Sequence, residues 1–159
     1  MMRQLDEAVV QTIALSLWLG AAALFVSSVA PAAFAVMPTR TLAGAIVGEV
    51  LPAVFYAGMA VGTAVMGLEL LAGRSVLWNR GLAATVMLAA CVIAQFVIGS
   101  RIDRLRVAIG GSLDTLPIGD VRRAAFGRLH GASVALLGLA MLAAAVALVM
   151  SMRALHPRT

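Results

Sequence analysis

Four long apolar runs alternate with short polar segments along the chain, at about 8–37, 42–72, 82–100 and 131–152. Each run has close to the 20 or so apolar residues that an α-helix needs to cross a hydrocarbon layer about 30 Å thick. The runs lack the apolar–polar alternation that is typical of a half-buried strand. The pattern therefore predicts an all-α membrane protein that crosses the bilayer four times.

Two residue types refine the picture of the first two runs. The stretch between Glu49 and Glu69 carries no charge, and about 20 residues at 1.5 Å each span one hydrocarbon thickness. We therefore expect the two carboxylates near opposite faces of the membrane. Pro31 lies inside the first run. Because proline removes a backbone donor, we expect a kink or a break there.

The connection between the third and fourth runs, 101–130, is long and rich in arginine. Asp103 and Arg106 have i,i+3 spacing, which indicates that the third helix extends into the aqueous phase. Gly110-Gly111 then ends it, and Asp120 marks the approach to the fourth helix. We expect one domain, residues 1–159, forming a four-helix bundle whose third and fourth helices extend beyond the bilayer, with 101–130 as an amphipathic, basic connection.

Composition supports a membrane protein. Hydrophobic residues make up 62% of the chain and charged residues 12%, against about 45–50% and 25% in soluble domains. Arginine supplies all twelve basic residues, and the net charge is +5. The basic segments lie between apolar runs and are not interleaved with aromatic residues. We therefore expect membrane lipids as partners, with anionic headgroups at 101–130, rather than nucleic acid.

Arginine also suggests an orientation. Four crossings put both termini on one side, and the side with the 101–130 connection carries more arginines. Positive residues favour the cytoplasmic side. We expect a protein of the bacterial inner (plasma) membrane, with the 101–130 connection in the cytoplasm and both termini outside.

Pairs of glycines at i,i+4 spacing suggest close helix packing, because small residues let two backbones approach in lipid. They are Gly44 with Gly48, Gly58 with Gly62, and Gly127 with Gly131. Packing within the bundle is one reading. Packing against a second copy, or within a larger membrane complex, is the other.

One group of polar residues shares a membrane level once the four runs are folded together. It consists of Glu49, Arg101, Arg104, Arg128 and His130. Ionisable groups at membrane depth are costly and call for a reason. The group could be an ion-pair clamp that joins helix ends, or a polar pocket for an anion, a proton or a lipid headgroup.

Candidate chemistry is sparse. His130 could titrate near neutral pH or bind a metal, but no cysteine or carboxylate lies at ligand spacing beside it. Motifs for phosphate binding or nucleophilic catalysis are missing. We predict no catalytic residues, no metal and no cofactor. The expected function is binding or transport through the polar cluster, and the alternative is an accessory subunit of a larger membrane complex.

Scattered residues resemble a known family. They are Trp18 and Gly20, Pro31 with Phe34, Pro52, and Phe126 with His130 and Ser133. This pattern resembles the four-helix membrane proteins similar to transmembrane protein 205, a domain of unknown function. Ser100 stands where that pattern has proline, and Ala135–Gly138 lack its asparagine. The resemblance implies a four-helix membrane bundle of uncharacterised biochemistry, and the link of a vertebrate relative to platinum-drug resistance points to transport or trafficking.

Overall fold

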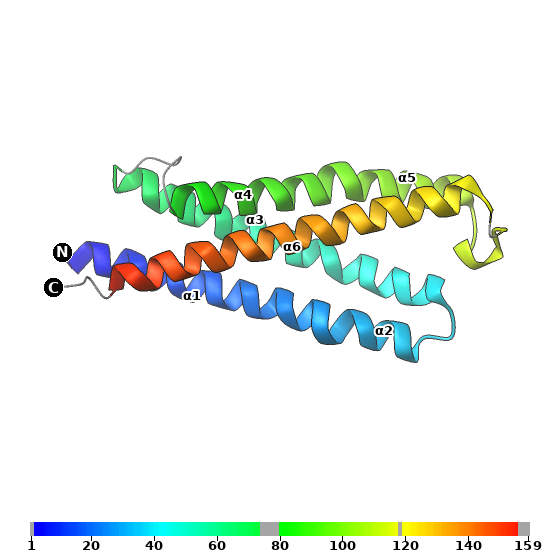
Figure 1. The fold of residues 1–159 in the computed structure, drawn as a ribbon, viewed down its shortest axis with the longest axis horizontal. Coiled ribbons are helices and arrows are strands. Elements are labelled where there is room, and N and C mark those ends of the chain that lie inside the picture. The colour runs from blue at the N-terminus through cyan, green and yellow to red at the C-terminus, as the bar shows by residue number, and fades with distance from the viewer. Residues whose placement is uncertain (1, 74–79, 118, 156–159) are drawn as a thin grey trace.

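The protein is an all-α bundle of four long helical segments, which confirms the predicted fold class (Figure 1). The computed structural model describes residues 2–73, 80–117 and 119–155. The first segment comprises α1 (Met2–Leu24), the π-helical turn η1 (Phe25–Val29) and α2 (Ala30–Val36). The second is α3 (Arg40–Leu71). The third comprises α4 (Arg80–Val92), the π-helical η2 (Ile93–Gly99) and α5 (Ser100–Ile109). The 3-10 turn η3 (Leu113–Thr115) leads to the fourth, α6 (Val121–Leu155).

All four segments are long and apolar enough to cross a membrane. They are Leu5–Val36, Arg40–Leu71, Arg80–Ile109 and Val121–Leu155. The start of α1, the end of α6 and the ends of α3 and α4 that are adjacent in sequence lie at one end of the molecule (Figure 1). We call this the terminal end. The link between α5 and α6 lies at the opposite end, which we call the loop end.

Buried positions repeat at intervals of three and four residues on every long segment. On α1 and η1 they are Ala8, Gln11, Leu15, Trp18, Ala22 and Phe25; on α6 they are Ser133, Leu137, Ala140, Ala144, Ala147 and Ser151. An alternating 3–4 spacing forms the seam of a left-handed helix bundle. The outward faces carry exposed large apolar side chains such as Leu17 and Leu142, as expected for a surface that lipid covers.

The bundle is closed at the terminal end and splayed at the loop end. Along its middle, α6 packs between α1 and α4, and α3 packs against α4 and α1. Towards the loop end α2 packs on α3, whereas η2 and α5 pack on α6. Figure 1 shows α2 diverging from α6 in this direction. The two pairs of helices leave a space between them that side chains fill only in part.

Pro31 distorts the first segment but does not break it. The helix continues to Val36, and the distortion is the π-helical turn Phe25–Val29 directly before the proline. The proline ring would clash with the carbonyl four residues earlier, and a widened turn relieves that clash. Of the predicted kink or break, the structure shows no break: the first segment continues through Pro31 as a distorted helix.

The predicted 101–130 connection is mostly helical. The third segment runs to Ile109 and the fourth begins at Val121, so only 110–120 link them. Gly110 ends α5 in the left-handed conformation (φ 65°), as its sequence suggested. Asp120 caps α6, because its Oδ1 accepts a hydrogen bond from the backbone N–H of Arg122 at 2.8 Å.

Candidate functional site

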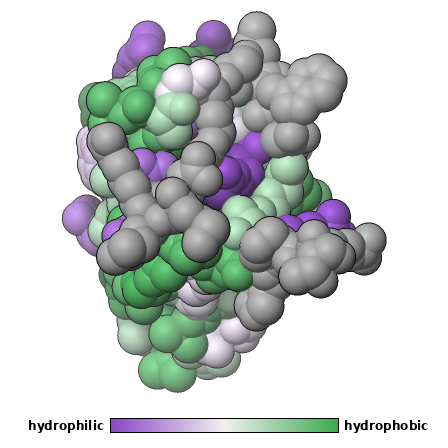
Figure 2. Space-filling model, turned by 90° about the vertical axis from the view of Figure 1, so that its left-hand side faces the viewer, coloured by the Kyte–Doolittle hydropathy of each residue, from purple (hydrophilic) through white to green (hydrophobic). Residues whose placement is uncertain are grey.

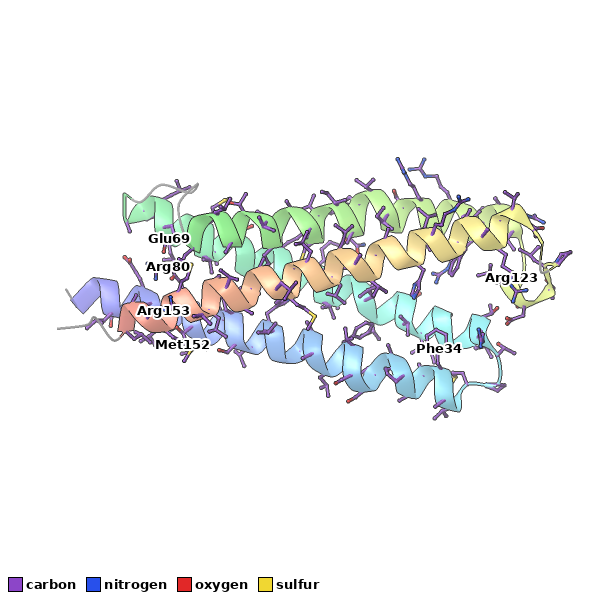
Figure 3. The ribbon with its side chains drawn as sticks, in the orientation of Figure 1. Phe34, Glu69, Arg80, Arg123, Met152 and Arg153 are labelled. Carbon is purple, nitrogen blue, oxygen red and sulfur yellow. The ribbon has the colours of Figure 1, made fainter. Side chains whose placement is uncertain are left out.

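A cavity of about 500 Å³ opens between α2, α3, η2, α5 and α6 at the loop end. Its deeper wall is apolar, and it is lined by Phe34, Val47, Leu51, Pro52, Phe55 and Ala94. Its outer wall is polar, and it is lined by Arg40, Asp103, Arg106, Asp114, Arg123 and His130. Figure 3 labels Phe34 and Arg123, which come from different helices, at this end of the bundle. Small-molecule sites in proteins have a similar size, about 300–1,000 Å³, and a similar mixture of apolar walls and few polar groups.

Arg106 reaches from α5 across to α3. Its Nη2 donates a hydrogen bond to the backbone carbonyl of Gly44 on α3 at 3.1 Å. Its Nη1 lies 3.9 Å from Oδ1 of Asp103, a wide ion pair with an aspartate that is 74% exposed. A Cβ atom on Gly48 would lie 2.9 Å from Nη1 of Arg106. Glycine at position 48 therefore provides the room for this guanidinium group.

Phe126 lies between Arg106 and His130. The guanidinium carbon of Arg106 lies 5.8 Å from the centre of the Phe126 ring, within the range of a cation–π contact. On α6 the rings of Phe126 and His130 are stacked with centroids 6.4 Å apart and an angle of 4° between planes. These residues are one turn apart, so α6 itself sets the stack. The arrangement gives the polar wall a flat aromatic surface beside a fixed positive charge.

The α5–α6 link is fastened to the start of α3. Oδ2 of Asp114 accepts hydrogen bonds from the hydroxyl of Thr41 at 2.7 Å and from its backbone N–H at 3.2 Å. The two bonds from Thr41 favour the carboxylate and hold the pKa of Asp114 below its usual range. The hydroxyl groups of Thr41 and Ser112 are 2.8 Å apart. Asp114 is therefore an anion with its own partners, and it lines the polar wall of the cavity.

The inner side of the cavity meets a tightly packed layer across the bundle. Ala94 and Gln95, which line the cavity, belong to the π-helical turn η2. Beyond it, the indole N–H of Trp18 donates to the carbonyl of Val54 at 2.9 Å. A Cβ atom on Gly58 would lie 2.7 Å from Sγ of Cys91 and 2.9 Å from Nε1 of Trp18. This close packing separates the cavity from the terminal end.

The structure brings one member of the predicted polar cluster to the cavity. His130 lines it, whereas Glu49, Arg101, Arg104 and Arg128 are exposed and are not among its lining residues. Arg104 donates to the carbonyl of Ser100, one turn away on its own helix, at 3.2 Å. The reason is the position of each residue around its helix. Ile102 and Arg106 lie on the face of α5 that lines the cavity, whereas Arg101 and Arg104 lie on another face. The sequence could predict that these residues lie at a similar membrane level, but not which side of each helix they occupy.

The residues of the family resemblance divide between the cavity and the core. Phe34, Pro52, Phe126, His130 and Ser133 line the cavity. Trp18 is buried in the core, while Pro31 is exposed. A Cβ atom on Gly20 would meet no described atom within 4 Å.

The glycine pairs have different surroundings. Gly58 packs against α1 and α4, and a Cβ on Gly62 would lie 3.1 Å from Cβ of Leu88 on α4. This face is therefore used within the chain, which is one of the two predicted readings. Gly44, Gly48 and Gly127 line the cavity. For Gly44, Gly127 and Gly131 an added Cβ would meet no described atom within 4 Å.

A second polar site, which the sequence did not reveal, lies buried at the terminal end. Glu69 on α3 is 3% exposed, and its Oε1 lies 3.2 Å from Nη2 of Arg80 on α4. The same oxygen accepts from the amide of Gln11 on α1 at 3.0 Å. Oε1 of Gln11 accepts from Nη1 of Arg80 at 3.1 Å and from the hydroxyl of Ser151 on α6 at 3.3 Å. We call these four residues the terminal-end network.

All four helices contribute to this network, and Figure 3 labels Glu69 and Arg80 close together at that end. Figure 2 looks onto the same end, where hydrophilic atoms lie among the helix ends and hydrophobic residues cover the sides. Gln11, Glu69 and Ser151 occupy seam positions. A satisfied polar group at a seam position fixes the register of a helix bundle. The signal in the sequence was a polar residue at the 3–4 spacing of three apolar runs, Gln11, Glu69 and Ser151.

Comparison with known proteins identifies the family. Residues 13–110 match the family model described as a domain of unknown function, DUF4149. This match spans more than half of the chain. The chain belongs to the DUF4149 family. No curated protein and no solved structure matches it.

The DUF4149 region and the cavity overlap in part. The matched residues run from α1 through α5 and include Trp18, Gly48 and Arg106. Phe126 and His130 lie beyond the matched residues, on α6. Among the described residues, no three His, Cys, Asp or Glu side chains are grouped as metal ligands would be. The cavity combines an apolar wall with three arginines, Arg40, Arg106 and Arg123.

Proposed function

We propose that this DUF4149 protein is a binding protein of the membrane, and that its cavity holds a small amphipathic molecule. The observation that carries the proposal is the cavity of about 500 Å³ with an apolar inner wall and a polar outer wall. Such a division matches a ligand with one apolar and one polar part. The proposal assigns no catalytic step to the cavity.

The position of the cavity in the bilayer supports this role. Glu49 and Glu69 bound an uncharged stretch of about one hydrocarbon thickness on α3. The apolar lining residues Leu51 and Phe55 lie inside this stretch, and Thr41 and Gly44 lie outside it. A ligand in the cavity would thus place its apolar part at the depth of acyl chains and its polar part at the depth of headgroups.

The finer assignments belong to the same proposal. We place the protein in the inner (plasma) membrane of a bacterium. We place the 110–120 link in the cytoplasm because more arginines lie on that side. The resemblance to transmembrane protein 205 supports a carrier or trafficking role, since five of its eight residues line the cavity.

Native mass spectrometry of the protein extracted with its own lipids tests the proposal. We expect the wild-type chain to retain a molecule of discrete mass. Gly127→Leu should lose it, because Gly127 lines the cavity and an added Cβ meets no described atom within 4 Å. Gly131→Leu is the matched control, one turn further along α6, equally open and outside the lining residues.

Two outcomes would overturn the proposal. One is a wild-type protein that retains no discrete molecule under conditions in which its circular dichroism and melting temperature remain those of the folded protein. The other is a bound molecule that both leucine variants retain equally. In the second case the molecule binds elsewhere on the bundle.

A further inference from the structure

The charge balance of the cavity favours an anion. Three arginines and two aspartates line it. One of the aspartates, Asp114, accepts hydrogen bonds from Thr41 and Ser112, and the other, Asp103, is largely exposed. A positive charge therefore remains at the polar wall, beside apolar surface where water screens it less than in bulk.

Arg106 is placed to receive that anion. A guanidinium group has five N–H donors in a planar fork, and one of them is used at normal hydrogen-bond length, by the carbonyl of Gly44. Its contact with Asp103 at 3.9 Å is longer than a charge-assisted hydrogen bond. The side chain is 38% exposed, so part of the group is accessible. The planar fork matches the two oxygens of a carboxylate or a phosphate.

The depth of Arg106 matches the headgroup layer. It contacts Gly44 and would meet a Cβ on Gly48, and both glycines lie directly outside the uncharged stretch that begins after Glu49. Anionic lipid headgroups occupy this layer at the cytoplasmic surface. Phe34, Leu51 and Phe55 line the same cavity on its apolar side. One ligand could thus contact Arg106 and the apolar wall together.

We infer that the ligand is an anionic amphiphile, whose carboxylate or phosphate group is bound by Arg106 and whose hydrocarbon chain lies along Phe34, Leu51 and Phe55. This inference rests on the proposed function and names its ligand class. Phe126 holds the guanidinium group from the α6 side through its cation–π contact. Gly48 keeps the α3 side open, because any larger residue would displace Nη1 of Arg106.

The experiment titrates the full chain, delipidated in detergent, with defined probes and measures retention by native mass spectrometry. Palmitate and phosphatidylglycerol carry a carboxylate and a phosphate. Hexadecanol has the chain of palmitate without the charge, and inorganic phosphate has the charge without the chain. The variants are Arg106→Gln and the matched control Arg128→Gln, an exposed arginine outside the lining residues.

We expect saturable binding of one anionic amphiphile, weaker binding of hexadecanol and little binding of phosphate. Arg106→Gln should weaken the binding of the anionic probes by roughly tenfold or more, the usual scale for the loss of a charge-assisted hydrogen bond. It should leave the binding of hexadecanol unchanged. Arg128→Gln should leave every probe unchanged. The tighter of palmitate and phosphatidylglycerol identifies the head as carboxylate or phosphate.

Contrary results separate this inference from the function on which it rests. Equal binding of palmitate and hexadecanol, unaffected by Arg106→Gln, would overturn the anionic head and leave an apolar binding protein. Binding of inorganic phosphate as tight as that of the lipids would overturn the claim that the ligand needs a hydrocarbon chain. Retention of no probe by the folded wild type would overturn the proposed function itself. If Arg106→Gln does not fold, Arg106→Lys keeps the charge without the fork. Unchanged palmitate retention in that variant would overturn the two-pronged contact of the guanidinium group with the anion.

Discussion

Arg106 on α5 donates a hydrogen bond to the carbonyl of Gly44 on α3, 62 positions earlier in the chain. This bond joins two helices that line the cavity, at the loop end of the bundle. The carbonyl of Gly44 lies early in α3 and the guanidinium group lies late in α5, so the contact joins the two helices at the loop end. The charge that we assign to ligand binding is thus also a charge that shapes the cavity.

Gly58 should tolerate no side chain. A methyl group there would lie 2.7 Å from Sγ of Cys91 and 2.9 Å from Nε1 of Trp18, so Gly58→Ala should reduce the free energy of unfolding by about 1–3 kcal/mol through overpacking. Gly67→Ala on the same helix is the control, since an added Cβ there meets no described atom within 4 Å. Thermal unfolding in detergent measures both. A Gly58→Ala variant as stable as Gly67→Ala would contradict the tight layer.

The terminal-end network should fail when one charge is removed. Arg80→Gln removes the ion pair between Arg80 and the buried carboxylate of Glu69, and breaking a buried ion pair costs about 3–5 kcal/mol. Adding Glu69→Gln to that variant should recover part of the loss. Glu49→Gln, at an exposed carboxylate on α3, should change stability little. Additive losses in the double variant would show that the two residues act independently.

Acid should weaken the start of α6. The side chain and backbone N–H of Arg122 lower the pKa of Asp120 to about 2, from an ordinary value near 3.9. A lowered folded-state pKa means that the cap stabilises the fold fully above about pH 4 and is lost as the pH falls towards 2. Asp120→Ala should therefore lower the melting temperature at pH 6. The difference from wild type should shrink below pH 4.

The control for this cap is Asp6→Ala, an exposed aspartate at the terminal end. It should change the melting temperature little at either pH. A stability difference for Asp120→Ala that stays constant from pH 6 to acid would contradict the assigned role of the Asp120 carboxylate.

The proposed orientation is open to chemical labelling. The single cysteine, Cys91, is fully buried, so a new cysteine reports its own location. Gly119→Cys lies in the α5–α6 link and Asp6→Cys at the terminal end. In intact cells, a membrane-impermeant maleimide should label Asp6→Cys and leave Gly119→Cys unlabelled. The reverse pattern would place the link outside the cell.

The four helical segments could be predicted from the sequence because lipid imposes a simple rule on any helix that crosses it. A crossing helix must satisfy its own backbone and present apolar side chains, so four apolar runs predicted four segments. The extension of the third and fourth helices beyond their apolar runs followed from other signals, namely the spacing of Asp103 and Arg106 and the Gly110-Gly111 pair. The structure ends the third segment at Ile109 and begins the fourth at Val121.

The candidate site was harder to predict because it depends on helical phase and on contacts between distant segments. His130 was singled out for its chemistry and does line the cavity, but Arg106 was noted only for its spacing from Asp103. Its contact with Gly44 joins α5 to α3, two segments that are far apart in the sequence. The terminal-end network likewise joins four segments, and no spacing along the chain pairs Gln11 with Glu69.

Photolabelling in vesicles tests the central claim, that an amphiphile occupies the cavity, most directly. A palmitate analogue with a photoreactive group in its chain is irradiated with the reconstituted protein, and the labelled peptides are sequenced. We predict saturable labelling around Phe34, Leu51 and Phe55, which unlabelled palmitate prevents and Gly127→Leu abolishes. Labelling confined to lipid-facing positions such as Leu17 and Leu142, without saturation, would contradict the account.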